Sequence, residues 1–258
     1  MTVHAHKNDN TSLRGRVSAE EWQVRVDLAA CYRLCHHAGI TDRINTHISA
    51  RVPGDADHFL LNPLGLLFDE VTASNLVKID MDGNKVGESA HEVNRAGYVI
   101  HSAVLIARAD VNCALHHHSA AGIAVSSLKE GLLPMSQQAQ QFYNRIGYHD
   151  YEGIALEEEE RERLGANLGQ HSAMLLRNHG VLTAADSVAA AYLLMDSLEA
   201  ACKAQLLAQA AGGEIHLPPH DVSEYTAKQF EQPNEWRYKI EWDAQLRMLD
   251  RLGIEYAV

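Results

Sequence analysis

The 258-residue chain has few cysteines, few aromatic residues and little positive charge. Its four cysteines include no Cys-x-x-Cys pair and do not provide a disulfide scaffold, so we expect a reduced, cytoplasmic protein. The 22 lysines and arginines are outnumbered by 34 aspartates and glutamates. The resulting net charge of −12 argues against a nucleic-acid-binding protein, which needs clustered basic side chains.

Long apolar runs are also missing. No stretch approaches the ~18–20 apolar residues that cross a bilayer, and the polar N-terminus is unlike a secretory signal, so we expect no membrane partner. Even so, 46% of the residues are hydrophobic, which is too many for a disordered chain. Histidine is abundant, with 16 copies, and it is both the commonest metal ligand and the usual acid or base near neutral pH.

Apolar periodicity and turn signals predict a mixed α/β chain. A Ser18–Glu21 capping box opens the first predicted helix. Helices are predicted over 18–39, 92–108, 120–129, 157–168, 187–211 and 233–252, and strands over 45–62 with a turn at 53–55, 77–80, 111–118, 173–176 and from 180 onward. Asp-Gly turns and the lack of strict β-α-β alternation favour a mostly antiparallel sheet.

The chain is expected to form one main domain with two appendages. The domain covers residues 18–215, and helices lie on the faces of its sheet. Residues 1–17 are predicted to form a loose N-terminal arm. Residues 216–258, where Pro218-Pro219 starts a linker, are predicted to form a helical extension packed on the same domain.

The segment Ala114-Leu-His-His-His-Ser119 is the sharpest local signal. On a strand, His116 and His118 share one face and His117 points to the other, so the first pair can hold a cation. The same sequence pattern would also arise from histidines at a strand end that bind no metal and are solvated or hydrogen-bonded. The turn Asn178-His179-Gly180 offers a third imidazole, although His179 could equally bond within its own turn. Three histidines with one open position are the usual catalytic metal arrangement.

Three segments taken together resemble the class II aldolase/adducin family: Asn45–Arg51 (NTHISAR), Ala109–Ser119 (ADVNCALHHHS) and Leu175–Leu182 (LLRNHGVL). The resemblance covers about residues 20–210. It implies a three-layer α/β/α domain around a largely antiparallel sheet, and a divalent metal, usually zinc, held by His116, His118 and His179. It also implies a homo-oligomer, commonly a tetramer, with active sites at subunit interfaces. The segments 131–136 and 147–153 are similar to adducin heads and their bacterial relatives.

The sequence departs from the sugar-phosphate aldolases of this family at two places. Those enzymes carry Ser-Ser-Glu ahead of the His-x-His strand, where the glutamate is the acid/base and the serines help hold phosphate. Here the glutamate position falls on Gly97, and the serine positions fall on Arg95 and Ala96. Glycine cannot transfer a proton, a contribution worth ~10²–10⁴ in rate. The Gly-Asn step of the phosphate loop is replaced by Thr46-His47.

Three residues are candidates for the missing roles. His149, in what we interpret as a connecting segment, and His101, one helical turn after Gly97, are the candidate proton-transfer residues. Alternatively, His149 makes a structural hydrogen-bonded corner, and His101 packs in its helix with a backbone partner. Arg95 could bind a substrate carboxylate in a bidentate manner, or could pair with Glu92 or solvent.

These features predict a metal-dependent lyase that acts on a small carbonyl or carboxylate substrate. Two alternatives stay open. One is a non-catalytic binding protein of the adducin-head type, which the missing glutamate favours. The other is an Fe(II)-dependent oxygenase that uses the same triad, because imidazole ligands suit zinc and iron alike.

Overall fold

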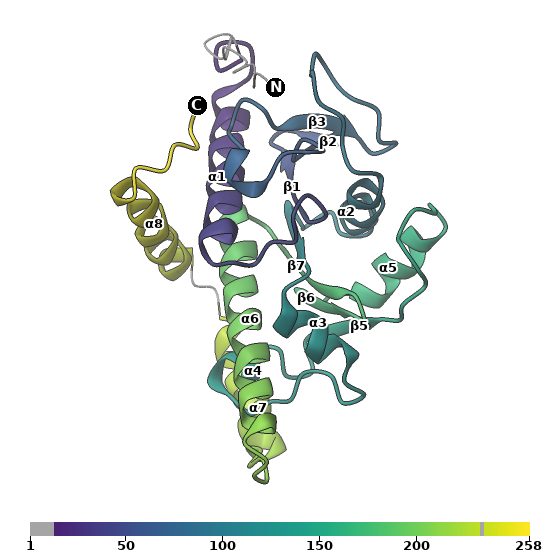
Figure 1. Ribbon diagram of the computed structural model, residues 1–258, viewed down its shortest axis with the longest axis vertical. Coiled ribbons are helices and arrows are strands. Elements are labelled where there is room, and N and C mark those ends of the chain that lie inside the picture. Colours follow the sequence, from purple (N-terminus) through teal and green to yellow (C-terminus); the bar gives the residue numbers. More distant parts are fainter. Residues whose placement is uncertain (1–12, 233–234) are drawn as a thin grey trace, which may run out of the picture.

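The computed structural model describes residues 13–232 and 235–258. Helices cover both faces of one sheet, which gives the three-layer α/β/α arrangement that the family resemblance implies (Figure 1). Residues 1–12 of the predicted N-terminal arm lie outside the described residues, and residues 13–17 form turns ahead of the first helix. Within the described ranges, no helix is long and apolar enough to span a membrane.

Seven strands form the central layer in the order β3-β2-β1-β4-β7-β6-β5. Their bounds are β1 His47–Val52, β2 Asp55–Leu61, β3 Val77–Asp80, β4 Cys113–His117, β5 Ile146–His149, β6 Ala173–Leu176 and β7 Gly180–Ala185. Only the β5–β6 pair is parallel, so the predicted mostly antiparallel sheet is confirmed. Strand β4 lies in the middle, between β1 and β7.

The helices divide between the two faces of the sheet. On one face lie α1 (Ala19–His37), α3 (Ala120–Ser127) and α6 (Val188–Ala210), and on the other lie α2 (Arg95–Ala107) and α5 (Glu160–Leu168). Figure 1 shows α1 and α6 to the left of the sheet and α2 and α5 to its right. A separate apolar cluster fills each interface, one around Leu28, Leu115 and Leu198, the other around Phe59, Val99 and Leu182. Both faces of β4 are therefore buried.

The C-terminal segment is more helical than the sequence suggested. The linker expected after Pro218-Pro219 is wrong, because α7 (His220–Phe230) begins directly after Pro219 and α8 is Glu235–Arg251. Proline tolerates the start of a helix, where its missing N–H would have no intrahelical partner. The segment contacts the main domain: the Trp242 indole N–H lies 3.4 Å from Asp27 Oδ1, and the Ala73 N–H donates to the Tyr256 carbonyl. Two short elements, α4 (Gln137–Gln140) and a 3₁₀ turn (Phe68–Glu70), were not predicted.

A buried ion pair attaches α1 to the end of the sheet. Ser18 caps α1 as expected, accepting from the Glu21 N–H at 3.0 Å, but the Glu21 carboxylate turns away from the cap. It pairs instead with Arg25 at 2.9 Å and with Lys78 of β3 at 2.5 Å. The Arg25 guanidinium, buried with Glu21, also donates to the Leu76 carbonyl. Burial lowers the Arg25 pKa, while Glu21 acts in the opposite direction.

Replacing Arg25→Met should lower the free energy of unfolding by about 3 kcal/mol, because Glu21 and two carbonyl groups lose a buried partner. Lys239→Met is the matched control, since Lys239 and Asp243 form an ion pair at the same i, i+4 spacing on the exposed side of α8. Its loss should cost less than about 1 kcal/mol. Urea unfolding of both variants measures the difference, and equal losses would contradict this account.

Candidate metal centre

The three histidines singled out from the sequence converge at one end of β4. His116 lies on β4, His118 follows the strand directly, and His179 lies in the turn that joins β6 to β7. In that turn Asn178 has a φ of +58°, a conformation that asparagine tolerates well. A side chain at Gly180 would collide with the His117 carbonyl, so glycine lets the turn lie against the end of β4. The Asn-His-Gly sequence therefore suits the close approach of His179.

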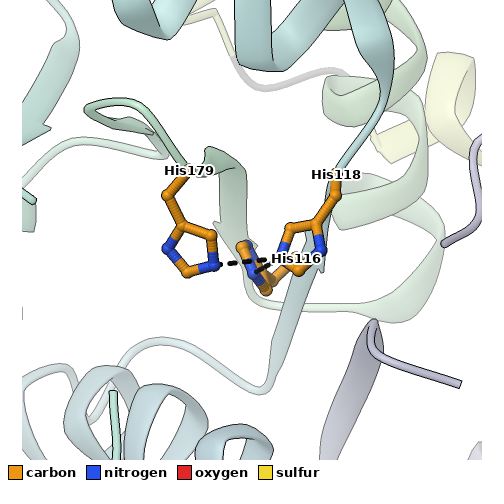
Figure 2. Close-up of side chains that lie close together, drawn as sticks. All are labelled: His116, His118 and His179. Carbon is orange, nitrogen blue, oxygen red and sulfur yellow. Dashed lines mark hydrogen bonds between the residues drawn. The ribbon is translucent and has the colours of Figure 1, made fainter. Parts of the chain in front are cut away.

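Three ring nitrogens of these residues meet at one point. His118 Nε2 lies 2.9 Å from His116 Nε2 and 2.9 Å from His179 Nε2. Figure 2 shows the three imidazoles pointing toward one another, two from β4 and its end and one from the facing turn. All three ligand atoms lie within 4.8 Å of one another. The predicted triad is thus brought together by the fold.

Hydrogen bonds behind two of the rings fix where their protons lie. His116 Nδ1 is 3.0 Å from the Val181 carbonyl, and His118 Nδ1 is 3.1 Å from Asp42 Oδ2. Both partners can only accept, so each Nδ1 carries the proton and each Nε2 presents a lone pair. Two lone pairs facing each other at 2.9 Å cannot make a hydrogen bond with each other. A cation between them resolves the conflict, so this donor set fits a divalent metal ion.

The charge state of the site agrees with this donor set. Burial, followed by the charges of His179 and His118, lowers the pKa of His116 well below its usual range. Burial and the same kind of repulsion from His118 lower the pKa of His179 to about 4. Burial raises the pKa of Asp42, but hydrogen bonds from His118, Arg43 and Asn45 outweigh it, so the net pKa is lowered. Neutral imidazoles are the form that binds metal, and an ionised carboxylate is a good acceptor behind one of them.

His101 lies behind the triad rather than in it. Its Nε2 is 3.0 Å from His47 Nδ1, and its Nδ1 is 2.5 Å from Ser49 Oγ. The alternative with a backbone partner is therefore wrong, because both partners are side chains of β1. His47 in turn pairs with His116 across β1 and β4, and their ring centroids lie 5.2 Å apart. His47 was noted in the sequence only as a change in the phosphate loop, and the strand register that places it beside the triad could not be derived there.

His149 does not lie in a connecting segment, and that interpretation was wrong. It ends strand β5, pairs with Leu176 in register and is buried. Its Nε2 is 3.2 Å from Glu160 Oε1, and its Nδ1 accepts from Asn167 Nδ2 at 2.8 Å. Both partners lie on α5, so the ring joins this helix to β5. A role of His149 in proton transfer stays a prediction, and it would require one of these hydrogen bonds to break.

Arg95 lies at the start of α2 with its guanidinium already engaged. It donates to Glu158 Oε1 at 2.8 Å and lies 5.1 Å above the Tyr98 ring. Of the two alternatives for Arg95, the pairing with Glu92 is wrong, because Glu92 bonds Lys85 instead. The side chain is half exposed, and its role in binding a carboxylate stays a prediction. Tyr151 is a further aromatic neighbour of the triad, with its ring 6.4 Å from that of His179.

Two buried histidines beside the ligands should make folding sensitive to acid. Burial, the first cause for each, lowers the pKa of His101 and of His117 to about 3. The unfolded chain therefore binds more protons below about pH 6.5, so the stability they contribute is complete above that pH and falls as the pH falls. For metal-free protein we expect a loss of about 2 kcal/mol from each group between pH 7 and pH 5. Urea unfolding across this range measures it.

His101→Gln should remove only its own share of the pH dependence, about 2 kcal/mol between pH 7 and pH 5, because the other buried histidines keep theirs. His36→Gln is the control for the substitution itself, because His36 is half exposed on α1. An unchanged slope in His101→Gln would show that His101 takes up protons in the folded state.

Comparison with known proteins gives a consistent picture. Residues 26–206 match the family described as Class II Aldolase and Adducin N-terminal domain. The crystal structure of an aldolase II superfamily protein from Pseudomonas syringae is 51% identical, with a TM-score of 0.92 over 96% of this chain and 100% of that one. L-fuculose 1-phosphate aldolase from Glaciozyma antarctica is 29% identical, with a TM-score of 0.80 over 90% and 92% of the two chains. Alpha-adducin from Rattus norvegicus is 41% identical over 89% of this chain, which corresponds to 33% of adducin.

The matched region includes every strand of the sheet and all three converging histidines. Two solved structures with identities above 25% share the fold over nine tenths or more of the chain. The chain therefore belongs to the class II aldolase and adducin N-terminal domain family.

Proposed function

We propose that this protein is a metal-dependent lyase that makes or breaks a carbon–carbon bond next to a carbonyl or carboxylate group of a small substrate. The observation that carries the proposal is the pair of imidazole lone pairs facing each other at 2.9 Å in His116 and His118. Two such lone pairs repel each other unless a cation lies between them. The likeness to an L-fuculose 1-phosphate aldolase supports an aldol-type reaction.

The chain's own groups divide the work of the site. His116, His118 and His179 would hold the ion, for which we propose zinc, while the Val181 carbonyl and Asp42 orient two of the rings. A bound divalent ion polarises a substrate carbonyl and stabilises the negative charge that develops on its oxygen. Tyr151, with 55% of its surface exposed, offers the substrate an aromatic wall beside His179.

A phosphorylated substrate has less support than an unphosphorylated one. By the family resemblance, the position of the acid/base of the sugar-phosphate aldolases falls on Gly97, and the positions of the two serines fall on Arg95 and Ala96. Arg95 is paired with Glu158, and a substrate carboxylate would have to displace that carboxylate to be bound. We therefore propose a small carbonyl or carboxylate compound as the substrate. We further propose a cytoplasmic homo-oligomer, with a tetramer as the expected state.

A second candidate function is that of a non-catalytic binding protein. It is favoured by the 41% identity to rat alpha-adducin. The two candidates differ in what they need from the triad, because a binding module does not require three converging imidazoles. Metal content and turnover therefore separate them.

Purified protein should contain about one divalent ion per chain. His116→Ala should lose it, because two imidazoles without the third form an incomplete site. His36→Ala is the control, since His36 is half exposed and faces Asp69 rather than the other two ligand candidates. Elemental analysis under anaerobic conditions measures the content and distinguishes zinc from iron, the metal that an Fe(II)-dependent oxygenase would need.

Metal-free protein that folds normally and takes up no Zn²⁺ would overturn the metal-dependent proposal. Metal-loaded protein without turnover on a panel of hydroxy-carbonyl and hydroxy-acid compounds, together with a stable protein partner in pull-down, would favour the binding function instead.

Asp42→Asn should weaken Zn²⁺ binding by about 10- to 100-fold, because the amide no longer fixes the His118 tautomer through an ionised acceptor. Asp69→Asn is the matched control, since Asp69 also faces a histidine, His36, but at 3.7 Å and on the surface. Competition with a chromogenic chelator measures both affinities. If the two variants bound zinc equally well, Asp42 would have no part in the site.

A further inference from the structure

Gly97 and His47 share one space beside the triad. A Cβ atom at position 97 would lie 2.8 Å from His47 Cδ2 and 3.0 Å from its Cγ. A Cβ contact of 2.8 Å is essentially never seen in folded proteins, so any side chain at 97 would have to push the imidazole aside. The ring of His47, from β1, thus occupies the volume that a side chain from α2 would otherwise fill. His47 can therefore take its observed position only because residue 97 is a glycine.

A buried hydrogen-bond chain fixes the proton on this ring. Ser49 Oγ is 2.5 Å from His101 Nδ1 and has no other hydrogen-bond partner in the described part of the chain. Ser49 is fully buried, and a buried hydroxyl proton needs an acceptor, so Ser49 donates to His101 Nδ1. His101 then carries its proton on Nε2 and donates to His47 Nδ1 at 3.0 Å. His47 must therefore carry its own proton on Nε2.

The free Nε2–H of His47 lies on the side of its ring away from His101. Among residues 13–232 and 235–258, no acceptor for it is found. The His47 ring is 5.2 Å from the His116 ring and tilted by 31° to it. His118 and His179 are near enough that their charges, after burial and His101, lower the pKa of His47 further. A neutral, fixed N–H donor without a partner therefore stands next to the three converging imidazoles.

We propose that His47 donates this Nε2–H hydrogen bond to a substrate oxygen at the three-histidine site, and that His101 and Ser49 are positioning residues that hold the donating tautomer. The inference rests on the proposed function for the presence of a substrate there. His47 stays neutral and gives up no proton. It stabilises the negative charge of a carbonyl or carboxylate oxygen by a fixed hydrogen bond, as a preorganised donor does. In this chain the polar group beside the triad is the His47 imidazole from β1, because Gly97 of α2 has no side chain.

The tautomers can be measured without metal or substrate. In ¹⁵N-histidine-labelled, metal-free protein, long-range ¹H–¹⁵N spectra should show His47 and His101 both protonated at Nε2. Ser49→Ala removes the hydroxyl that sets the direction of the chain and should give a mixture of tautomers at both rings. Ser49→Thr keeps the hydroxyl and should restore the single tautomer. His47 protonated at Nδ1 in the unmodified protein would overturn the inference.

Donation to a ligand oxygen can be measured with acetohydroxamate, an anionic oxygen ligand, on Zn²⁺-loaded protein. His47→Phe keeps a ring but has no donor, and should bind the probe about 10- to 100-fold more weakly, the value of one hydrogen bond to a charged group. His47→Gln keeps an N–H near the Nε2 position and should recover most of the affinity. Zinc content should be equal in all three proteins.

The failure of this inference is distinguishable from failure of the proposed function. Protein that takes up no zinc overturns the proposed function, whatever the tautomers are. Protein that binds zinc, but whose affinity for the probe is the same in His47→Phe, overturns the donor role alone. Should His47→Phe fold poorly, Gly97→Ala gives the same test, because its Cβ displaces the His47 ring. Unchanged affinity for the probe there would also contradict the donor role.

Discussion

The site depends on one constraint: the imidazole lone pairs of His116 and His118 are held face to face at 2.9 Å at the end of the buried strand β4. Such pairs repel each other unless a cation lies between them, so the protein must hold each ring from behind. For His116 this is done by the Val181 carbonyl of β7, and for His118 by the Asp42 carboxylate from the loop before β1. The segments on both sides of β4 therefore have two roles. They complete the sheet, and they supply the hydrogen-bond acceptors that orient His116 and His118.

Burial favours the neutral form of the histidines at this site, and it also makes the stability of the fold sensitive to acid. In a buried site the neutral form of histidine is favoured, which keeps His116 and His179 in the form that can bind metal. The same burial means that His101 and His117 resist protonation in the fold while the unfolded chain does not. Stability therefore has to come from elsewhere, and the two apolar clusters that enclose β4 on both faces supply it. A rigid middle strand is thus a requirement of the site.

The sequence could predict those parts of the site that depend on local spacing. The i, i+2 period of a strand placed His116 and His118 on one face, and the Asn-His-Gly turn offered His179. The layers and the mostly antiparallel sheet were predicted equally well, with family resemblance supplying the architecture. What could not be predicted depends on register and distance in the chain. Asp42 lies 76 residues before its partner His118, and the pairing of His47 with His116 follows from the alignment of β1 with β4. His149 was misplaced because β5 reads Ile-Gly-Tyr-His, and a glycine inside so short a segment weakens the strand signal that the equally short β3 and β6 carry.

Positions 97 and 47 are far apart in the sequence but share one space in the fold. A departure from the family's sequence pattern at one of them therefore has to be interpreted together with the other. Taken alone, Gly97 is the loss of an acid/base, and His47 is an unrelated change in a loop 50 residues earlier. In the fold the two are one event, because the imidazole occupies the space over the glycine. Each change requires the other: a side chain at 97 would displace the ring, and without the ring a cavity would remain beside the triad. A glycine where the resemblance places the family's glutamate therefore does not by itself mean the loss of a polar group at this place. It marks a site whose polar group is delivered from the sheet, with its hydrogen-bonding direction set by Ser49 through His101.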